Sequence, residues 1–416
     1  MTDGLALAAA LVVLAATLAV AVTRPPHVSE AVAAATGAVL LVVVGAIGLS
    51  GADHALRTLG PTVGFLAAML LIADGCRREG LFDAMGAVMA RGSGGSPQRL
   101  LAFVFVIAAA ITAVLSLDAT IVLLTPVVFA TAARMRTSAR PQVYACAHLA
   151  NSASLLLPVS NLTNLLAFHA SHLSFLRFAA LMVLPTIAAV AVEWVVFKRF
   201  FAADLTRPRH AGARPARPDL PRFAVAVLAF TLAGFALSSV VGIEPVWFAA
   251  VGAAAITGPA LARRTATPVA LARAAEPGFL IFVLALGVIV QAASVNGLDS
   301  AVRAVLPTGG SLPDLLAIAA LSAVFANLVN NLPATLMLIP VAAATGGAGP
   351  VLAVLIGVNV GPNLTYVGSL ATLLWRRVLR AEDTDVELGE FLRLGALTVP
   401  AALVAATVLL WLALKA

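Results

Sequence analysis

Two stretches of small polar residues interrupt apolar segments of this chain and hold most of its candidate binding groups. They span residues 151–167 and 359–375, and an alignment without gaps pairs Asn151 with Asn359. In hydrocarbon, an unwound backbone is tolerated only where protein or a polar cavity satisfies its N–H and C=O groups. Interrupted apolar segments at matching positions of two halves are typical of the binding site of a two-repeat transporter.

The hydroxyl and amide groups of these stretches can both donate and accept hydrogen bonds. If each stretch is a broken helix, its half-helix ends direct their dipoles at whatever binds between them. The alternative is that these side chains only connect neighbouring membrane helices. The predicted site residues are Asn151, Ser160, Asn161, Thr163 and Asn164 in the first stretch and Asn359, Asn363, Ser369 and Thr372 in the second.

Asp118 stands at the centre of the apolar segment 100–133, two residues before Thr120. A charged carboxylate near the middle of a membrane costs roughly 2.5–3.5 kcal/mol on insertion scales. Such a residue is typically a proton relay or an ion ligand, so Asp118 is the predicted carrier of a coupling proton and Thr120 a predicted neighbour in the site. The alternative role for Asp118 is a helix N-cap ahead of Ala-Thr-Ile.

Three asparagines, Asn327, Asn330 and Asn331, occupy the centre of a second apolar segment, 312–344. Their amide groups suit a polar uncharged solute or a cation that binds carbonyl oxygens. The alternative is a capping and turn motif, with Pro333 in the first turn of the following helix.

Other candidate residues have weaker signals. His148 could shuttle protons but could equally pack in the interior. Cys146 would be a soft ligand for a thiophilic solute, although one thiol coordinates poorly. Glu193 and Asp74 fall near predicted cytoplasmic helix ends, where we expect them to be solvated.

The composition requires a membrane protein. The chain is 61% hydrophobic and 11% charged, with a mean hydropathy of +1.03, and apolar runs long enough to cross a bilayer recur along it. Segments 100–133 and 312–344 are each too short for two crossings, so they are predicted re-entrant helical hairpins, with two tight spans or one kinked span as the alternative. The ten predicted crossings are 4–23, 31–50, 60–76, 142–169 and 177–199 in the first half and 222–241, 246–262, 277–297, 350–375 and 392–414 in the second.

Each half therefore has five crossings, one hairpin and one broken helix. Because five is odd, the second half must enter the membrane in the opposite sense, which makes an inverted repeat. The predicted units are a first repeat 1–200, a cytoplasmic linker 201–221 and a second repeat 222–416.

The basic residues support this topology through the positive-inside rule. With the N-terminus outside, only four of the 26 Lys and Arg fall outside. We therefore expect a multi-pass protein of the inner (cytoplasmic) membrane with both termini extracytoplasmic. The net charge of +7 then reflects orientation and not a nucleic-acid partner, and a docking surface at the arginines of 198–222 is the second interpretation. The four outside residues are Arg57, Arg177, Arg303 and Lys415.

Several function classes lack their motifs. The sequence has no zincin helix motif, no phosphate-binding Gly loop with Lys and no Ser/His/Asp set, so we expect no enzyme and no cofactor. Two cysteines give no disulfide framework and no metal spacing. No Arg or Lys lies at either hairpin tip or in the core of either broken helix, which favours a neutral hydroxylated solute over a carboxylate.

The motifs resemble those of bacterial arsenite permeases, the membrane subunits of arsenical efflux pumps. The most specific match is Gly361-Pro362 followed by the run 368–375, Gly-Ser-Leu-Ala-Thr-Leu-Leu-Trp. Further matches are Asn330-Asn331-Leu332-Pro333, the motif around Asp118 and the run 153–162. The resemblance covers nearly the whole chain. It implies an ion-transporter-superfamily fold that exports arsenite and antimonite in exchange for protons, in some members with a soluble ATPase partner.

The chain departs from that family's pattern, which tends to have Asn at position 117, Asp at positions 151 and 359 and Lys at position 363. Asp118 would then be the one midplane acid. The alternatives are a sodium-coupled carrier of a dicarboxylate or another anion in the same superfamily, and a sodium/proton antiporter. An intramembrane enzyme or a passive channel is the least favoured interpretation.

Overall fold

The computed structural model describes residues 3–23, 25, 27–206, 219–345, 347–382, 384 and 386–416. Every regular element in these ranges is helical. Nine of the described helices are long and apolar enough to cross a membrane. The chain is therefore an all-α polytopic membrane protein, as predicted. Most of the predicted linker 201–221, including its arginines at 207, 209, 214 and 217, lies outside the described residues.

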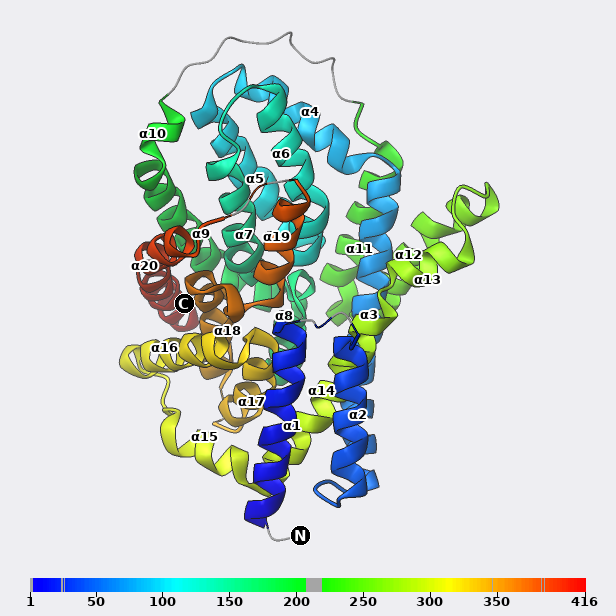
Figure 1. Cartoon of the computed structure of the whole chain (residues 1–416), viewed down its shortest axis with the longest axis vertical. Coiled ribbons are helices and arrows are strands. Elements are labelled where there is room, and N and C mark those ends of the chain that lie inside the picture. Colours follow the sequence, from blue (N-terminus) through cyan, green and yellow to red (C-terminus); the bar gives the residue numbers. More distant parts are fainter. Residues whose placement is uncertain are drawn as a thin grey trace.

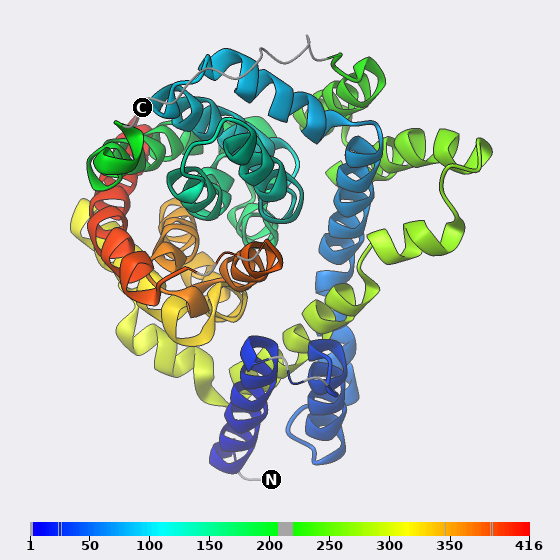
Figure 2. The ribbon, with the colours of Figure 1, turned by 45° about the horizontal axis from the view of Figure 1, so that its top comes forward.

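The helices form two bundles that lie side by side (Figure 2). The scaffold bundle consists of α1 (Asp3–Thr23), α2 (Glu30–Val43), α3 (Leu49–Arg78), α11 (Arg222–Val241), α12 (Pro245–Ala262) and α14 (Pro277–Ala293). The core bundle consists of α5 (Pro97–Val114), α6 (Thr125–Arg134), α7 (Arg140–Ser152), α8 (Leu162–Ser171), α9 (Phe175–Phe200), α16 (Leu312–Val329), α17 (Asn331–Ala343), α18 (Ala348–Val360), α19 (Leu370–Ala381) and α20 (Leu388–Lys415). Shorter helices connect or extend them: α4 (Leu81–Ser93), α10 (Ala202–Leu205), α13 (Pro268–Ala274) and α15 (Asp299–Val305).

The packing repeats between the two halves of the chain. Helix α2 packs on α14 as α12 packs on α3, and α1 packs on α2 as α11 packs on α12. The last long helices of the two halves, α9 and α20, pack against each other. Figure 1 places α5 and α6 in the upper half of the molecule and α16 and α17 in the lower half, so the two hairpins approach from opposite ends. These features are those of an inverted repeat.

Both predicted hairpins are present as pairs of helices. In the first, α5 ends at Val114 and the chain turns back through 115–118. A hydrogen bond of 2.7 Å between the Thr112 and Thr120 hydroxyl groups joins the two sides of this turn. In the second, α16 and α17 meet at Asn330, whose φ of 76° reverses the chain in one residue. The interpretation as one long kinked span is therefore wrong for both segments.

Both predicted broken helices are interrupted, and in the same way. Short 3₁₀ turns follow α7 at Ala153–Leu156 and α18 at Gly361–Leu364. Extended residues then appear at the positions that the ungapped alignment pairs, Leu157 with Thr365 and Asn161 with Ser369. The next helix begins one residue later in each case.

The backbone of the second broken helix packs directly against the backbone of α16 in hairpin two. A Cβ added to Gly357 would lie 2.3 Å from the Ala319 carbonyl oxygen, and one added to Gly361 would lie 2.6 Å from the Ala323 Cα. Small residues allow membrane helices to approach this closely. The interruption at 361–369 is therefore held directly by α16.

Two helix boundaries in the first half were predicted wrongly, and one helix was missed. Helix α2 ends at Val43 and not at 50, because Gly45 turns the chain with a φ of 75°. Helix α3 begins at Leu49 and not at 60, and Pro61 lies inside it. The predicted loop between 76 and 100 contains the amphipathic helix α4.

Candidate functional site

A small cavity lies where both hairpin tips meet both interrupted helices. Its volume is about 50 Å³, enough for a few groups the size of water. Phe65 and Leu66 of α3 and Phe279 of α14 contribute apolar walls from the scaffold bundle. The polar side chains in the lining are Ser116, Asp118, Asn161, Thr163, Asn331 and Ser369.

Asp118 faces this cavity and does not cap the following helix. The Ala119 N–H donates instead to the Ser116 hydroxyl, at 3.1 Å, and the Asp118 side chain makes no capping hydrogen bond. Within the described part of the chain, no group donates to the Asp118 carboxylate. The capping interpretation of Asp118 is therefore wrong, and its carboxylate is available to whatever enters the cavity.

The N-termini of the two C-terminal half-helices meet at the cavity. The Asn161 side chain accepts a hydrogen bond from the Thr163 N–H and caps α8. The Ser369 hydroxyl accepts from the Ala371 N–H and caps α19. Helix N-termini carry partial positive charge, so both ends favour oxygen lone pairs or negative charge at the centre of the cavity.

Behind the cavity, Asn359 joins the two interrupted helices. Its side-chain oxygen accepts from Thr163 at 2.8 Å and Asn161 at 3.3 Å. Its amide group donates to Asn164 at 2.7 Å and Ser154 at 3.1 Å. All four partners belong to the first repeat, so the buried Asn359 side chain connects the repeats and holds two cavity-lining residues in place.

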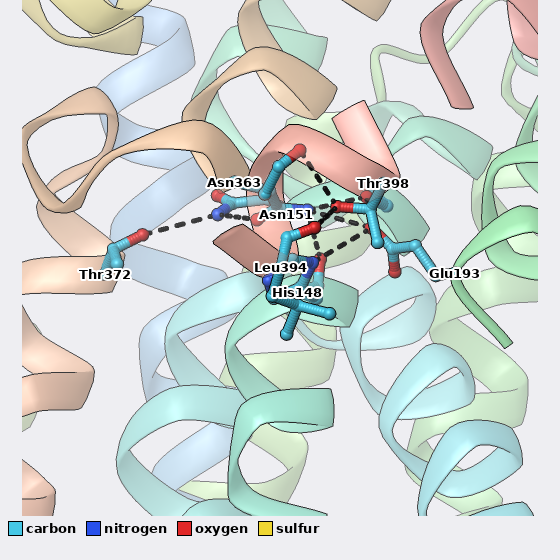
Figure 3. Close-up of polar contacts among 9 residues, drawn as sticks. His148, Asn151, Glu193, Asn363, Thr372, Leu394 and Thr398 are labelled. Carbon is cyan, nitrogen blue, oxygen red and sulfur yellow. Dashed lines mark hydrogen bonds and ion pairs between the residues drawn. The ribbon is translucent and has the colours of Figure 1, made fainter. Parts of the chain in front are cut away.

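A second buried hub, Asn363, extends this connection (Figure 3). Its side-chain oxygen accepts from Asn151 at 2.8 Å. Its amide group donates to the Ser152 hydroxyl at 2.9 Å and to Glu193 Oε1 at 3.0 Å. Asn151 also reaches the Thr372 hydroxyl at 3.5 Å. Asn151, Asn363 and Thr372 are buried and do not line the cavity.

Other predicted site residues anchor the hairpins. Asn327 donates to the Gly361 carbonyl at 2.9 Å and Asn330 to the Val367 carbonyl at 2.9 Å, which ties hairpin two to the second interruption. Ser160 donates to the Ala113 carbonyl at 2.8 Å, which ties the first interruption to hairpin one. Thr120 holds the two arms of hairpin one together. These contacts position the cavity, and a role in binding solute stays a prediction for every residue named.

A larger cavity, of about 460 Å³, lies between α3, α8, α14 and α17. Successive turns of α8 line the two cavities, Leu165 the smaller one and His169 the larger one. On α17, Leu332 lines the smaller cavity and Leu336 lines the larger one. The larger cavity therefore adjoins the smaller one on the side of hairpin two.

Glu193 was predicted to be solvated, and this was wrong. The residue is 1% exposed and accepts a hydrogen bond of 2.6 Å from the Ser152 hydroxyl. The error arose because depth along α9 was judged from distance to the helix end. A single acid within a long apolar helix was the signal that could have identified it. Asp118 is consequently not the only acid in the interior.

The remaining candidates lie outside the cavity. His148 is fully buried between the Phe197 and Phe391 rings. Cys146 is also buried and lines neither cavity. Asp74 is bound to Arg77 and Arg78 at the end of α3.

Residues 10–361 match the sequence profile of a family described as citrate transporter, CitMHS. The chain belongs to the CitMHS family. This protein is therefore a membrane transporter.

Among relatives of this CitMHS protein, an arsenical pump membrane protein of Escherichia coli is 28% identical over 92% of this chain and 94% of its own length. A putative arsenical pump membrane protein of Bacillus subtilis is 23% identical over 91% and 93%. An uncharacterized transporter of Mycobacterium tuberculosis is 25% identical over 83% and 84%. These relatives confirm the resemblance that the motifs indicated.

The fold is similar to that of the Alcanivorax borkumensis YdaH transporter, described as having an unusual topology. The TM-score is 0.57 at 15% identity, over 88% of this chain and 87% of the other. At this identity the similarity concerns the fold alone.

We predict that Asn359→Ala destabilises the protein by about 2 kcal/mol. The change removes four hydrogen bonds between the repeats, each worth about 0.6 kcal/mol in a membrane. Thermal unfolding in detergent measures the effect. Ser322→Ala is the control, since the buried Ser322 hydroxyl has no hydrogen-bond partner in the part of the chain that the structure describes, and its removal should cost almost nothing. Equal unfolding temperatures for both variants would contradict the structural role of Asn359.

Proposed function

We propose that this protein is a secondary active transporter that exports arsenite and antimonite across the cytoplasmic membrane in exchange for protons. The observation that carries the proposal is the chemistry of the small cavity. Its polar lining consists of hydroxyl and amide groups and one carboxylate, and none of the described residues that line it is Lys or Arg. The similarity to arsenical pump membrane proteins supports the same solute.

The cavity suits a small neutral solute with several hydroxyl groups. Undissociated arsenite has three hydroxyl groups, and the side chains of Asn161, Thr163 and Asn331 can each donate and accept hydrogen bonds. The N-termini of α8 and α19 favour the lone pairs of its oxygens. A carboxylate solute is usually bound by Arg or Lys, so this lining favours arsenite over a citrate-like anion.

Asp118 is the proposed carrier of the exchanged proton. Acidic side chains inside membranes typically mark proton or ion pathways. In this scheme Asp118 takes up a proton from outside as the solute leaves and releases it to the cytoplasm as the next solute binds. The larger cavity on the side of hairpin two is the proposed extracellular exit of this alternating-access cycle. A soluble ATPase subunit could add to this scheme but is not needed by it.

A sodium-coupled carrier of citrate-like or other anions is the second candidate, and a sodium/proton antiporter is the third. The family's description favours the anion carrier. The unwound segments also present carbonyl oxygens, which coordinate sodium in transporters of this general design. Under this alternative, Ser160, Asn161 and Thr163 would contribute to the sodium site.

An imposed ion gradient separates the candidates. We predict that liposomes containing the purified protein accumulate arsenite when a pH gradient is applied in sodium-free buffer, because a proton carrier needs no sodium. The measurement is radiolabelled or mass-spectrometric arsenite uptake, with protein-free liposomes as the control. Sodium-dependent uptake of citrate or succinate, without arsenite uptake, would favour the anion carrier.

The substitution Asp118→Asn should abolish arsenite resistance in cells that lack their own exporter. The variant keeps the shape of the side chain but cannot exchange a proton. Asp53→Asn is the matched control, because the Asp53–Arg57 ion pair is exposed and exposed pairs contribute at most about 1 kcal/mol. Growth on arsenite and membrane abundance are measured together. Full resistance of the Asp118→Asn variant at normal abundance would overturn the proposal.

We also propose that both termini are extracytoplasmic and that 201–221 is cytoplasmic. Both native cysteines are buried and can be replaced by Ala. A single Cys at exposed Thr206 should then resist an impermeant thiol reagent in intact cells, while one at exposed Thr308 should react. Disrupted cells, in which both sites react, provide the control. The reverse labelling pattern would invert the topology.

A further inference from the structure

Deep in the core bundle, behind the cavity, lies an acid–base pair. His148 Nδ1 is 3.5 Å from Glu193 Oε1, and the two side chains are 0% and 1% exposed. Neither side chain lines the small cavity. The pair joins α7, the first half of a broken helix, to α9.

This pair has unused bonding capacity. Glu193 Oε2 and both ring nitrogens of His148 are buried without a hydrogen-bond partner among the described residues, so the 3.5 Å contact is an ion-pair distance and not a hydrogen bond. A carboxylate oxygen and an imidazole nitrogen that lack other partners can each hold a proton. The Phe197 and Phe391 rings border the imidazole. The surroundings therefore suit a proton that is held by the pair and kept from bulk water.

Glu193 forms hydrogen bonds with residues of both repeats (Figure 3). Glu193 Oε1 accepts hydrogen bonds from Ser152 of the first interruption, at 2.6 Å, and from Asn363 of the second, at 3.0 Å. Hydrogen bonds to a charged acceptor are roughly twice as strong as those between neutral groups. Adding a proton to Glu193 would therefore weaken two contacts that hold the broken helices in register.

A series of hydrogen-bonded residues leads from this pair to the cavity. Asn363 accepts from the Asn151 side chain, and the backbone carbonyl oxygen of Asn151 accepts from Ser154 at 2.6 Å. Ser154 accepts in turn from Asn359, which holds the cavity-lining Asn161. A change in the strength of the Glu193 contacts can thus reach the solute through named, buried partners.

We propose that His148 and Glu193 form a second proton-binding site, distinct from Asp118, whose occupancy is coupled to the solute cavity through Asn363 and the two broken helices. The coupling to transport rests on the proposed function. The binding of a proton by the pair does not.

Other titratable groups lie on the elements packed around this pair. Tyr144 precedes His148 by one turn of α7, and Glu390 of α20 is bound to Arg140 at the start of α7. Lys198 of α9 lies over the Trp194 ring, and Arg376 of α19 lies over the Tyr366 ring. Each of these charged side chains therefore contacts a residue other than His148 or Glu193.

Infrared difference spectroscopy of the purified full-length protein, between about pH 5 and 8, tests this site without any solute. A buried carboxyl group that gains a proton adds a C=O stretching band. We expect Glu193→Gln to lose one such band that Asp118→Asn keeps, and His148→Gln to move its titration midpoint. Thr407→Val is the control, because the buried Thr407 hydroxyl on α20 bonds to none of the described residues and its loss should change no band.

Superimposable spectra of wild type and Glu193→Gln would overturn the second site. If Glu193→Gln does not fold, His148→Gln and Glu193→Asp carry the test, and an unchanged midpoint in both would overturn it. In liposomes, we expect the number of protons moved per arsenite to fall in Glu193→Gln relative to wild type, and an unchanged ratio would overturn the coupling. Absence of arsenite transport by the wild type would contradict the proposed function and leave the infrared result standing.

Discussion

Interrupting a helix inside a membrane frees backbone groups that hydrocarbon cannot satisfy, and the core bundle is organised around satisfying them. Asparagine side chains perform much of this task. Asn164 donates to the carbonyl oxygens of Ser154 and Leu157 in the first interruption. Asn327 and Asn330 donate to carbonyl oxygens of the second interruption from hairpin two. Hairpin two is therefore fixed by the same bonds that satisfy the carbonyl groups of the second interruption.

These bonds also connect the repeats, and their number matters more than their individual strength. A single hydrogen bond between membrane helices contributes only about 0.6 kcal/mol, so no one contact holds the core bundle together. Asn359 and Asn363 each bind several groups of the first repeat. The two interruptions are thus expected to respond as one unit when a solute or proton changes the charge beside them.

The arrangement of the site could be predicted because polar residues recur at paired positions of two apolar segments, and the structure places extended residues at the aligned positions 157/365 and 161/369. The direction in which each side chain points could not be predicted from the sequence. Asn331 faces the cavity whereas Asn327 and Asn330 bind backbone, although all three stand within five residues. Glu193 was missed because burial on α9 depends on the packing of α7, α20 and the second repeat. The predicted start of α3 was eleven residues too late, and the structure places Pro61 within this helix, as membrane helices tolerate.

The positions of the two cysteines bear on how a thiophilic solute would be handled. Cys76 and Cys146 are buried, and neither lines the small or the large cavity. Thiolates form strong bonds to soft metals and metalloids, and a carrier that offered them would release its cargo slowly. The small cavity is lined by hydroxyl, amide, carboxylate and apolar groups, which bind such a solute more weakly and release it more readily. Trivalent arsenic could then move through this protein without becoming a covalent inhibitor of it.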